Sequence, residues 1–207
     1  MKKKILIIFF SIILINISIY LNFFYKNENR PIALGLNLNE NIGELIEGNQ
    51  IEQYFKLNKD YKLSGIEIMF STFNRINNGK TKIDILDGEE VLEEIILNNS
   101  DILDNTKMPI YFNKDIDKFS KNLNIKITSN ATNGNGITLW KDNTEKNNEN
   151  ILYINGERTK GQIVLDLLIK RKIDIVDLIC INIFFIVINI GMIKFISFLI
   201  KTNVKNV

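Results

Sequence analysis

The stretch from Ser64 to Gly88, SGIEIMFSTFNRINNGKTKIDILDG, constrains the fold of this chain more than any other. On the first arm Ile66, Ile68 and Phe70 point one way, while Glu67 and Ser71 point the other. On the second arm Thr81, Ile83 and Ile85 alternate with Lys82 and Asp84. A period of two is typical of a strand with one buried face and one exposed face. Between the two runs lies Asn77-Asn78-Gly79, and Asn and Gly tolerate the positive φ angles that tight hairpin turns need. The pattern therefore predicts a β-hairpin in the middle of a β-sandwich.

Short strand-like runs continue along the chain at intervals of about 8–12 residues, the spacing expected of a sandwich or barrel. Asn, Asp and Gly, which favour turns, separate them. The expected strands are Glu44–Ile46, Ile51–Leu57, Gly65–Thr72, Thr81–Leu86, Val91–Leu97, Met108–Phe112, Asn122–Thr128, Ile137–Trp140, Ile151–Ile154 and Gln162–Leu167. We expect a mainly β fold, an antiparallel jelly-roll β-sandwich.

Two segments have an ambiguous pattern. Val91–Leu97 could instead form one helical turn, and Gln162–Lys170 could begin a helix that runs into a membrane. We favour a strand through about Leu167, because Asn155-Gly156 and Gly161 bracket a hairpin.

Both ends of the chain are apolar enough to be membrane spans. Ile5–Tyr25 follows a run of lysines and carries no charge, and Leu178–Ile200 carries only Lys194. About 20 apolar residues cross the hydrocarbon core as a helix. A cleaved signal peptide is the alternative for the first run, but Leu21–Phe24 offers no small residues for cleavage. We therefore expect an N-terminal anchor over 1–25 and a transmembrane helix over 178–200.

Basic residues beside the spans predict their orientation. Lys2–Lys4 precede the first span, and Lys201 and Lys205 follow the second, so both chain ends are expected in the cytoplasm. Lys170–Lys172 disagree with this rule, which is weak for long translocated segments. The expected order is a linker over 26–42, an extracytoplasmic domain over 43–168, a juxtamembrane segment over 169–177 and a cytoplasmic tail over 201–207.

Composition excludes several kinds of chemistry. The chain has no histidine, which removes the commonest metal ligand and the commonest general base near neutral pH. Its one cysteine is Cys180, inside the second apolar run, so the central domain has no disulfide, thiol nucleophile or Cys-based zinc site. The formal net charge of +2 does not suggest a nucleic-acid partner.

Four pieces of the chain carry a family resemblance. They are IGELIEGNQIEQYF (Ile42–Phe55), LSGIEIMFSTFNRINNGKTKIDILD (Leu63–Asp87), DILDNTKMPIYF (Asp101–Phe112) and NGNGITLWKDN (Asn133–Asn143). Together they resemble an ectodomain of bacterial multi-span membrane proteins of cell-surface polysaccharide synthesis and related membrane glycosyltransferases. The resemblance implies a jelly roll on the outer face of the membrane, placed after a first transmembrane helix. This chain has one further span in place of a helix bundle that would carry transferase chemistry.

Polar residues gather at the end of the predicted hairpin. Thr72, Asn74, Arg75 and Asn77 could form a sugar pocket, because Arg and Asn direct hydrogen bonds to hydroxyl groups. Alternatively, Arg75 pairs with a neighbouring carboxylate and the Asn residues shape the turn. Trp140, the single tryptophan, is either a platform for a sugar ring or a packed core residue.

Acidic residues offer two further candidate sites. Asp104 and Asn105 could ligate Ca²⁺ through carboxylate and amide oxygens, although no regular EF-hand series surrounds them, and an Asx-turn is the alternative. Glu89-Glu90 and Glu93-Glu94 are paired carboxylates of the kind that glycoside hydrolysis uses, but exposure on one strand also explains them. We expect no catalytic residues and no cofactor other than this candidate Ca²⁺.

Three functions follow as hypotheses. The first is a membrane-anchored module of the cell envelope that recognises a surface glycan or docks on a multi-span polysaccharide-assembly protein, without catalysis. The second is a structural two-span relative or fragment of a larger membrane glycosyltransferase that packs against partner helices. The third is a hydrolase of surface glycans, which the absence of histidine disfavours.

Overall fold

The computed structural model describes most of the central part of the chain and short helical pieces towards its ends. The described residues are 29–120, 122–144 and 150–171, with 7, 10–15, 17–19, 21, 179–180, 182–184, 186–188, 190–191 and 193–194. Contacts divide the chain into a compact unit, Asn29–Lys170, and a second unit made of the two chain ends.

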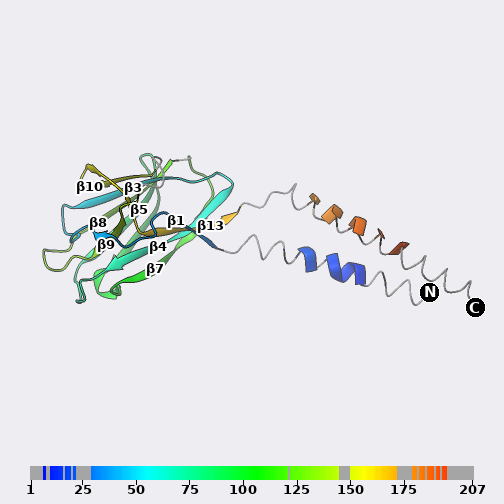
Figure 1. The fold of residues 1–207 in the computed structure, drawn as a ribbon, viewed down its shortest axis with the longest axis horizontal. Coiled ribbons are helices and arrows are strands. Elements are labelled where there is room, and N and C mark those ends of the chain that lie inside the picture. The colour runs from blue at the N-terminus through cyan, green and yellow to red at the C-terminus, as the bar shows by residue number, and fades with distance from the viewer. Residues whose placement is uncertain are drawn as a thin grey trace, which may run out of the picture. The chain divides into compact units, whose positions relative to one another are not determined.

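The compact unit consists of two antiparallel sheets, as the sequence predicts for a mainly β sandwich (Figure 1). The seven-stranded sheet holds β1 (Arg30–Ala33), β13 (Leu165–Arg171), β4 (Tyr61–Ser71), β9 (Thr138–Asp142) and β12 (Gln162–Ile163), with β2 (Glu40–Asn41) beside β9 and β7 (Thr106–Ile116) beside β4. The six-stranded sheet runs in the order β11 (Glu157–Thr159), β10 (Ile151–Ile154), β3 (Gln50–Lys56), β8 (Asn122–Ser129), β5 (Lys80–Asp87) and β6 (Glu90–Asn98). A 3-10 turn, η1 (Asn99–Asp101), follows β6.

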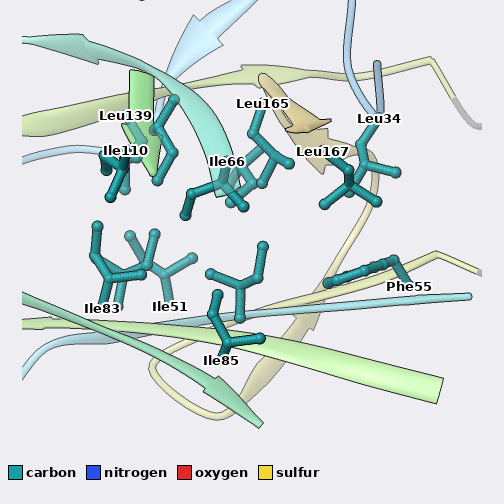
Figure 2. Close-up of a cluster of buried hydrophobic side chains, with 14 of the residues drawn as sticks. Leu34, Ile51, Phe55, Ile66, Ile83, Ile85, Ile110, Leu139, Leu165 and Leu167 are labelled. Carbon is teal, nitrogen blue, oxygen red and sulfur yellow. The ribbon is translucent and has the colours of Figure 1, made fainter. Parts of the chain in front are cut away.

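The core lies between the two sheets. Alternate residues of each strand point inward, as in β8, where Leu123, Ile125 and Ile127 are all fully buried. Figure 2 shows the two layers of apolar side chains facing one another, with Ile66 from one sheet and Ile85 from the other. Each large apolar side chain buried in this way contributes about 1.5–3 kcal/mol to the free energy of unfolding.

The predicted hairpin over Ser64–Gly88 is wrong. Its two arms are strands, β4 and β5, but they belong to different sheets. Residues 72–79 form an arch that crosses from one sheet to the other, and β5 instead pairs with β6 and β8. The alternation does predict the buried faces, because β4 and β5 both turn an apolar face to the same core. That pattern cannot distinguish strands that pair side by side from strands that face each other across a sandwich.

The stretch predicted as a linker contributes two strands, which corrects that prediction. Arg30–Ala33 pairs along β13, and Glu40-Asn41 pairs with β9. Conversely, the strand expected over Glu44–Ile46 is reduced to a single bridge between Leu45 and Ile137. Backbone pairing with strands more than a hundred residues away holds this segment in place. The polar composition of the segment itself does not indicate this pairing.

The two ambiguous segments both form strands. Val91–Leu97 lies within β6, and no helical turn interrupts it. Strands β12 and β13 cover Gln162–Leu167, with a break at Val164. The N–H of Val164 donates to the carbonyl of Trp140, and its carbonyl accepts from the N–H of Met69. The final strand continues to Arg171, beyond the predicted limit.

The predicted membrane spans lie largely outside the described residues. Those residues of 5–25 and 178–200 that the structure describes are helical. Within the described part of the chain, no helix is long and apolar enough to cross a membrane, so both spans stay predictions. The ends of the sandwich unit lie side by side, because Arg30 is opposite Ile169 in the β1–β13 pair.

Candidate functional site

The carboxylate of Asp104 holds the start of the arch. It accepts hydrogen bonds from the backbone N–H of Thr72 at 2.5 Å and from the hydroxyl of Ser71 at 2.8 Å. These donors, together with the N–H of Asn74, keep the pKa of Asp104 below its usual range. A cation is poorly suited to this carboxylate, because the groups around it are themselves donors.

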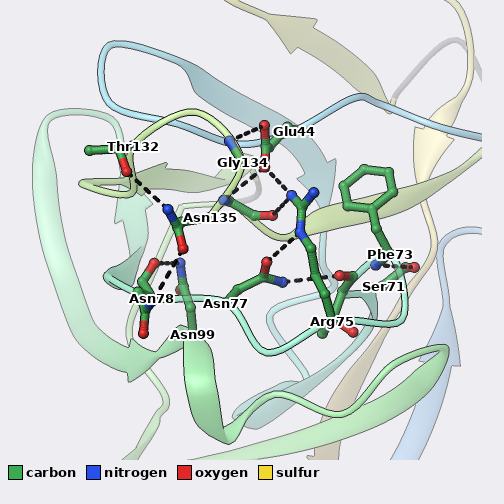
Figure 3. A network of polar contacts seen from close by, with 12 residues as sticks. Glu44, Ser71, Phe73, Arg75, Asn77, Asn78, Asn99, Thr132, Gly134 and Asn135 are labelled. Atoms are coloured by element: carbon green, nitrogen blue, oxygen red, sulfur yellow. Dashed lines mark hydrogen bonds and ion pairs between the residues drawn. The ribbon is translucent and has the colours of Figure 1, made fainter.

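Arg75 holds the middle of the arch (Figure 3). Its guanidinium pairs with the carboxylate of Glu44 and donates to the carbonyl of Gly136 at 3.1 Å and to the side chain of Asn77 at 2.7 Å. The buried Asn77 side chain donates in turn to the carbonyl of Thr72 at 3.2 Å. These contacts match the alternative in which Arg75 pairs with a carboxylate and Asn shapes the turn.

Trp140 connects to the same network from β9. Its indole N–H donates to the amide oxygen of Asn105 at 2.8 Å, and the Asn105 amide donates to Asp104 at 2.8 Å. The candidate residues of the arch, the loop at Asp104 and Trp140 are thus joined by hydrogen bonds into one network. Most of their polar groups are directed at one another, which leaves few of them for a ligand.

Glu93 and Glu94, the second of the two glutamate pairs, bind different partners. Glu93 and Glu94 are neighbours on β6 and therefore point to opposite faces of the sheet. The Glu93 carboxylate accepts hydrogen bonds from Asn113 at 3.3 Å, whereas Glu94 pairs with Lys82 at 2.8 Å.

A groove on the outer face of the six-stranded sheet was not predicted. Its volume is about 720 Å³, and it follows the outward side chains of β3. The lining residues are Gln50, Glu52, Tyr54, Phe55, Lys56, Asn122, Ile151, Tyr153 and Gly156. Strands β8 and β10, which flank β3 in the sheet, supply the sides of the groove.

Two tyrosines and a carboxylate define the chemistry of the groove. The rings of Tyr54 and Tyr153 meet edge to face, with centroids 5.7 Å apart and an angle of 76° between their planes. Glu52 accepts hydrogen bonds from the Tyr54 hydroxyl at 3.0 Å and from the Gln50 amide at 2.9 Å. Burial and the neighbouring Glu52 raise the pKa of Tyr54, so its hydroxyl stays protonated. The arrangement offers an apolar ring beside oriented polar groups.

The sequence contains part of the signal for this groove. In Gln50–Lys56, the outward positions carry Gln50, Glu52 and Tyr54, and this set mixes an aromatic ring with hydrogen-bonding groups. The second ring, Tyr153, comes from β10, and only the pairing of Tyr153 with Glu52 brings it there. A pairing between residues about a hundred positions apart cannot be read from local patterns.

Comparisons with known proteins add little. No family model matches the chain, and no curated protein matches it. Among solved structures, a family two carbohydrate esterase from Cellvibrio japonicus is similar over 71% of this chain, with 10% identity and a TM-score of 0.29. The match spans 36% of that esterase, and a likeness this slight supports no conclusion about fold or activity.

Proposed function

We propose that this chain is a membrane-anchored module of the bacterial cell envelope that recognises a glycan without catalysing a reaction. Its jelly-roll sandwich lies outside the cytoplasmic membrane. One membrane span precedes the sandwich and one follows it, and both chain termini are in the cytoplasm. The apolar chain ends and the resemblance to ectodomains of polysaccharide-synthesis proteins support this location. The adjacent ends of the sandwich, Arg30 and Ile169, suit two spans that enter the same membrane.

The groove over β3 carries the proposal. A sugar ring has apolar faces and a rim of hydroxyl groups, so it fits a site with an aromatic ring and oriented polar side chains. Tyr54 is 36% exposed and can present its ring, while Glu52 and Gln50 are held by hydrogen bonds beside it. The fixed positions of these side chains reduce the entropy that is lost on binding.

The groove favours binding over hydrolysis. Glycoside hydrolysis requires two carboxyl groups on either side of the scissile bond, about 5–10 Å apart. Among the described residues that line the groove, Glu52 is the single carboxylate. It is engaged by Tyr54 and Gln50, which fits a binding residue better than a general acid.

Glycan binding by the full chain tests this proposal. The chain would be purified in a detergent without a sugar headgroup, because such headgroups would compete for the groove. Immobilised envelope glycans are expected to retain it, and Tyr54→Ala or Tyr153→Ala is expected to weaken binding by about tenfold or more. Tyr111→Ala is the matched control, since Tyr111 is 64% exposed on the other sheet. Absence of binding, or equal binding by all variants, contradicts the proposal.

Docking on a multi-span polysaccharide-assembly protein is the second candidate function. The observation that favours it is the apolar surface of the arch and its neighbouring loop, where Ile76 is 83% exposed, Leu103 69% and Phe73 41%. Exposed apolar groups of this kind mark protein interaction sites. Co-purification of a multi-span partner that is lost in Ile76→Asp, but kept in Tyr54→Ala, would assign docking to the arch.

A further inference from the structure

The outward side chains of the six-stranded sheet form two rows that begin in the groove and continue across β8 onto β5. Leu123, Ile125 and Ile127 point into the core, so the residues of β8 that alternate with them point outward, and the same holds for β5. The cross-strand register places these outward residues in line. One row is polar and consists of Tyr153, Glu52, Lys126 and Asp84, and the other is mainly apolar and consists of Ile151, Tyr54, Asn124 and Leu86. We call the two rows together the outer strip.

The outer strip is longer than one sugar ring. It crosses the neighbouring strands β10, β3, β8 and β5. Neighbouring strands lie about 4.8 Å apart, so the strip extends over about 14 Å. The groove occupies the end at β10 and β3, while Asp84 and Leu86 lie on β5 at the other end. A ligand that fills the whole strip is therefore a chain of sugars.

Two buried oxygen atoms of the outer strip lack hydrogen-bond donors. Asn124 and Asp84 are each 7% exposed, and the Oδ1 atom of each has no partner among the described residues. A buried polar atom without a hydrogen bond costs stability, which an apolar side chain of similar shape does not. Both atoms are acceptors, so the partners that they lack are donors, such as the hydroxyl groups of a sugar. Each row of the strip supplies one of these acceptors, beyond the residues that line the groove.

Both side chains can turn these oxygens toward a ligand. The last torsion of an Asn or Asp side chain has a broad energy minimum, so the amide or carboxylate rotates at low cost. The ammonium of Lys82 lies 3.2 Å from the other oxygen of Asp84, but Lys82 also pairs with Glu94 at 2.8 Å. Lys82 therefore keeps an ionic partner when a hydroxyl group takes its place at Asp84.

The charges of the outer strip favour an uncharged chain. Lys126 lies opposite both Glu52 and Asp84 in the register, and Lys82 contacts Asp84. Each carboxylate of the strip thus has an ammonium group beside it. These described residues leave no surplus of either sign that would attract an ionic polymer.

We propose that the outer strip binds an uncharged linear oligosaccharide, with one sugar in the groove and the next sugars over β8 and β5. Tyr54 and Leu86 contact the apolar faces of the rings, while Asn124 and Asp84 accept hydrogen bonds from their hydroxyl groups. Asn124 and Asp84 thereby distinguish a chain from a short sugar. This inference rests on the proposed function, which it extends from a sugar ring to a sugar chain.

Calorimetric titration of the full chain, in a detergent without a sugar headgroup, tests the proposal. The probes are the disaccharides and hexasaccharides of glucose, mannose and N-acetylglucosamine, and a hexasaccharide of galacturonic acid supplies the anionic comparison. In at least one neutral series, the hexasaccharide is expected to bind about tenfold more tightly than the disaccharide. The anionic chain is expected to bind no better than that neutral hexasaccharide.

Two variants test the acceptors. Asp84→Leu is expected to weaken hexasaccharide binding about three- to tenfold and to leave disaccharide binding unchanged, because β8 separates Asp84 from the groove strand β3. Asn124→Leu is expected to weaken hexasaccharide binding by a similar factor. It is also expected to raise the temperature of thermal unfolding, because it removes an unpaired buried oxygen. Asp117→Leu is the matched control, since Asp117 is exposed in the loop between β7 and β8.

The outcomes separate this proposal from glycan recognition itself. Equal affinity for disaccharide and hexasaccharide overturns the outer strip as a binding site and leaves the groove as a sugar site, as does unchanged hexasaccharide binding in both variants of the strip. Stronger binding of the anionic chain overturns the assignment of an uncharged ligand. Lack of binding by every probe, at either length, contradicts the proposed function as well.

Discussion

The carboxylate of Asp142, at the end of β9, accepts a hydrogen bond of 2.9 Å from the backbone N–H of Leu36, which precedes it by 106 residues. The N–H groups of Asn37 and Thr144 and the Thr144 hydroxyl donate to the same carboxylate. Burial opposes the charge of Asp142, but these donors outweigh burial and hold its pKa well below the usual range. This one side chain fixes the connection between β1 and β2.

Asp142 is expected to make the stability of the sandwich depend on pH. Because its pKa is depressed in the folded state, the ionised group contributes fully above the pKa of an unfolded Asp, about 3.9, and loses that contribution as pH falls further. Asp142→Asn should lower the free energy of unfolding by about 1–3 kcal/mol near pH 7 and by less near pH 3. Urea unfolding at both pH values measures this, with the exposed Asp60→Asn as a control. An equal loss at both pH values would contradict the assignment.

Gly79 is expected to tolerate no side chain. Its φ is +96°, and a Cβ atom would lie 3.0 Å from the Cα of Ala131. Gly79→Ala should therefore lower the free energy of unfolding by about 2–4 kcal/mol, through backbone strain and steric contact. Gly88→Ala separates the two causes, because Gly88 also has a positive φ, +65°, but no atom near its Cβ position. If both variants lose the same stability in thermal unfolding, the steric part of the prediction is wrong.

Gln53 is expected to join the two sheets through the core. It is fully buried, accepts a hydrogen bond of 3.0 Å from the N–H of Ile163 and donates to the carbonyl of Ile151 at 3.3 Å. Gln53→Leu keeps the volume but leaves both backbone groups buried without these partners, which should cost about 2–5 kcal/mol. Gln50→Leu, on the outward side of the same strand, should cost less than about 1 kcal/mol. Chemical unfolding of the two variants gives the comparison.

Glu44 and Arg75 are expected to act as a coupled pair in the arch. Glu44 also accepts hydrogen bonds from the N–H groups of Gly134 at 2.9 Å and Gly136 at 3.0 Å, so it orders two loops at once. A double-mutant cycle with Glu44→Ala and Arg75→Ala should give a coupling energy of about 0.5–2 kcal/mol in unfolding experiments. Additive losses would show that the ion pair makes no net contribution, as for many exposed pairs.

Local patterns were sufficient to predict most strands and their buried faces. The alternation in Gly65–Thr72 and Asn122–Thr128 predicts β4 and β8, because burial on one face imposes a period of two. It cannot show which strands are neighbours. The prediction that β4 and β5 form a hairpin is wrong for this reason. Strand β1, Arg30–Ala33, was not predicted, because its place at a sheet edge depends on pairing with β13.

The candidate site shows the same limit. Residues within one loop, such as Arg75 and Asn77, were grouped correctly because their contact is local. The link from Trp140 to Asn105 joins segments 35 residues apart, and the meeting of Tyr54 with Tyr153 joins two distant strands. Clusters assembled by sheet pairing therefore require the structure.

The pairing of β1 with β13 has a mechanical consequence. Arg30 begins the first strand and Ile169 lies near the end of the last, so the two points of attachment are at the same end of one antiparallel pair. A force that separates the flanking segments acts on the hydrogen bonds one at a time, like the opening of a zipper, instead of shearing them all together. The first and last strands should peel away at low force in single-molecule pulling, while the interior of the sandwich stays intact.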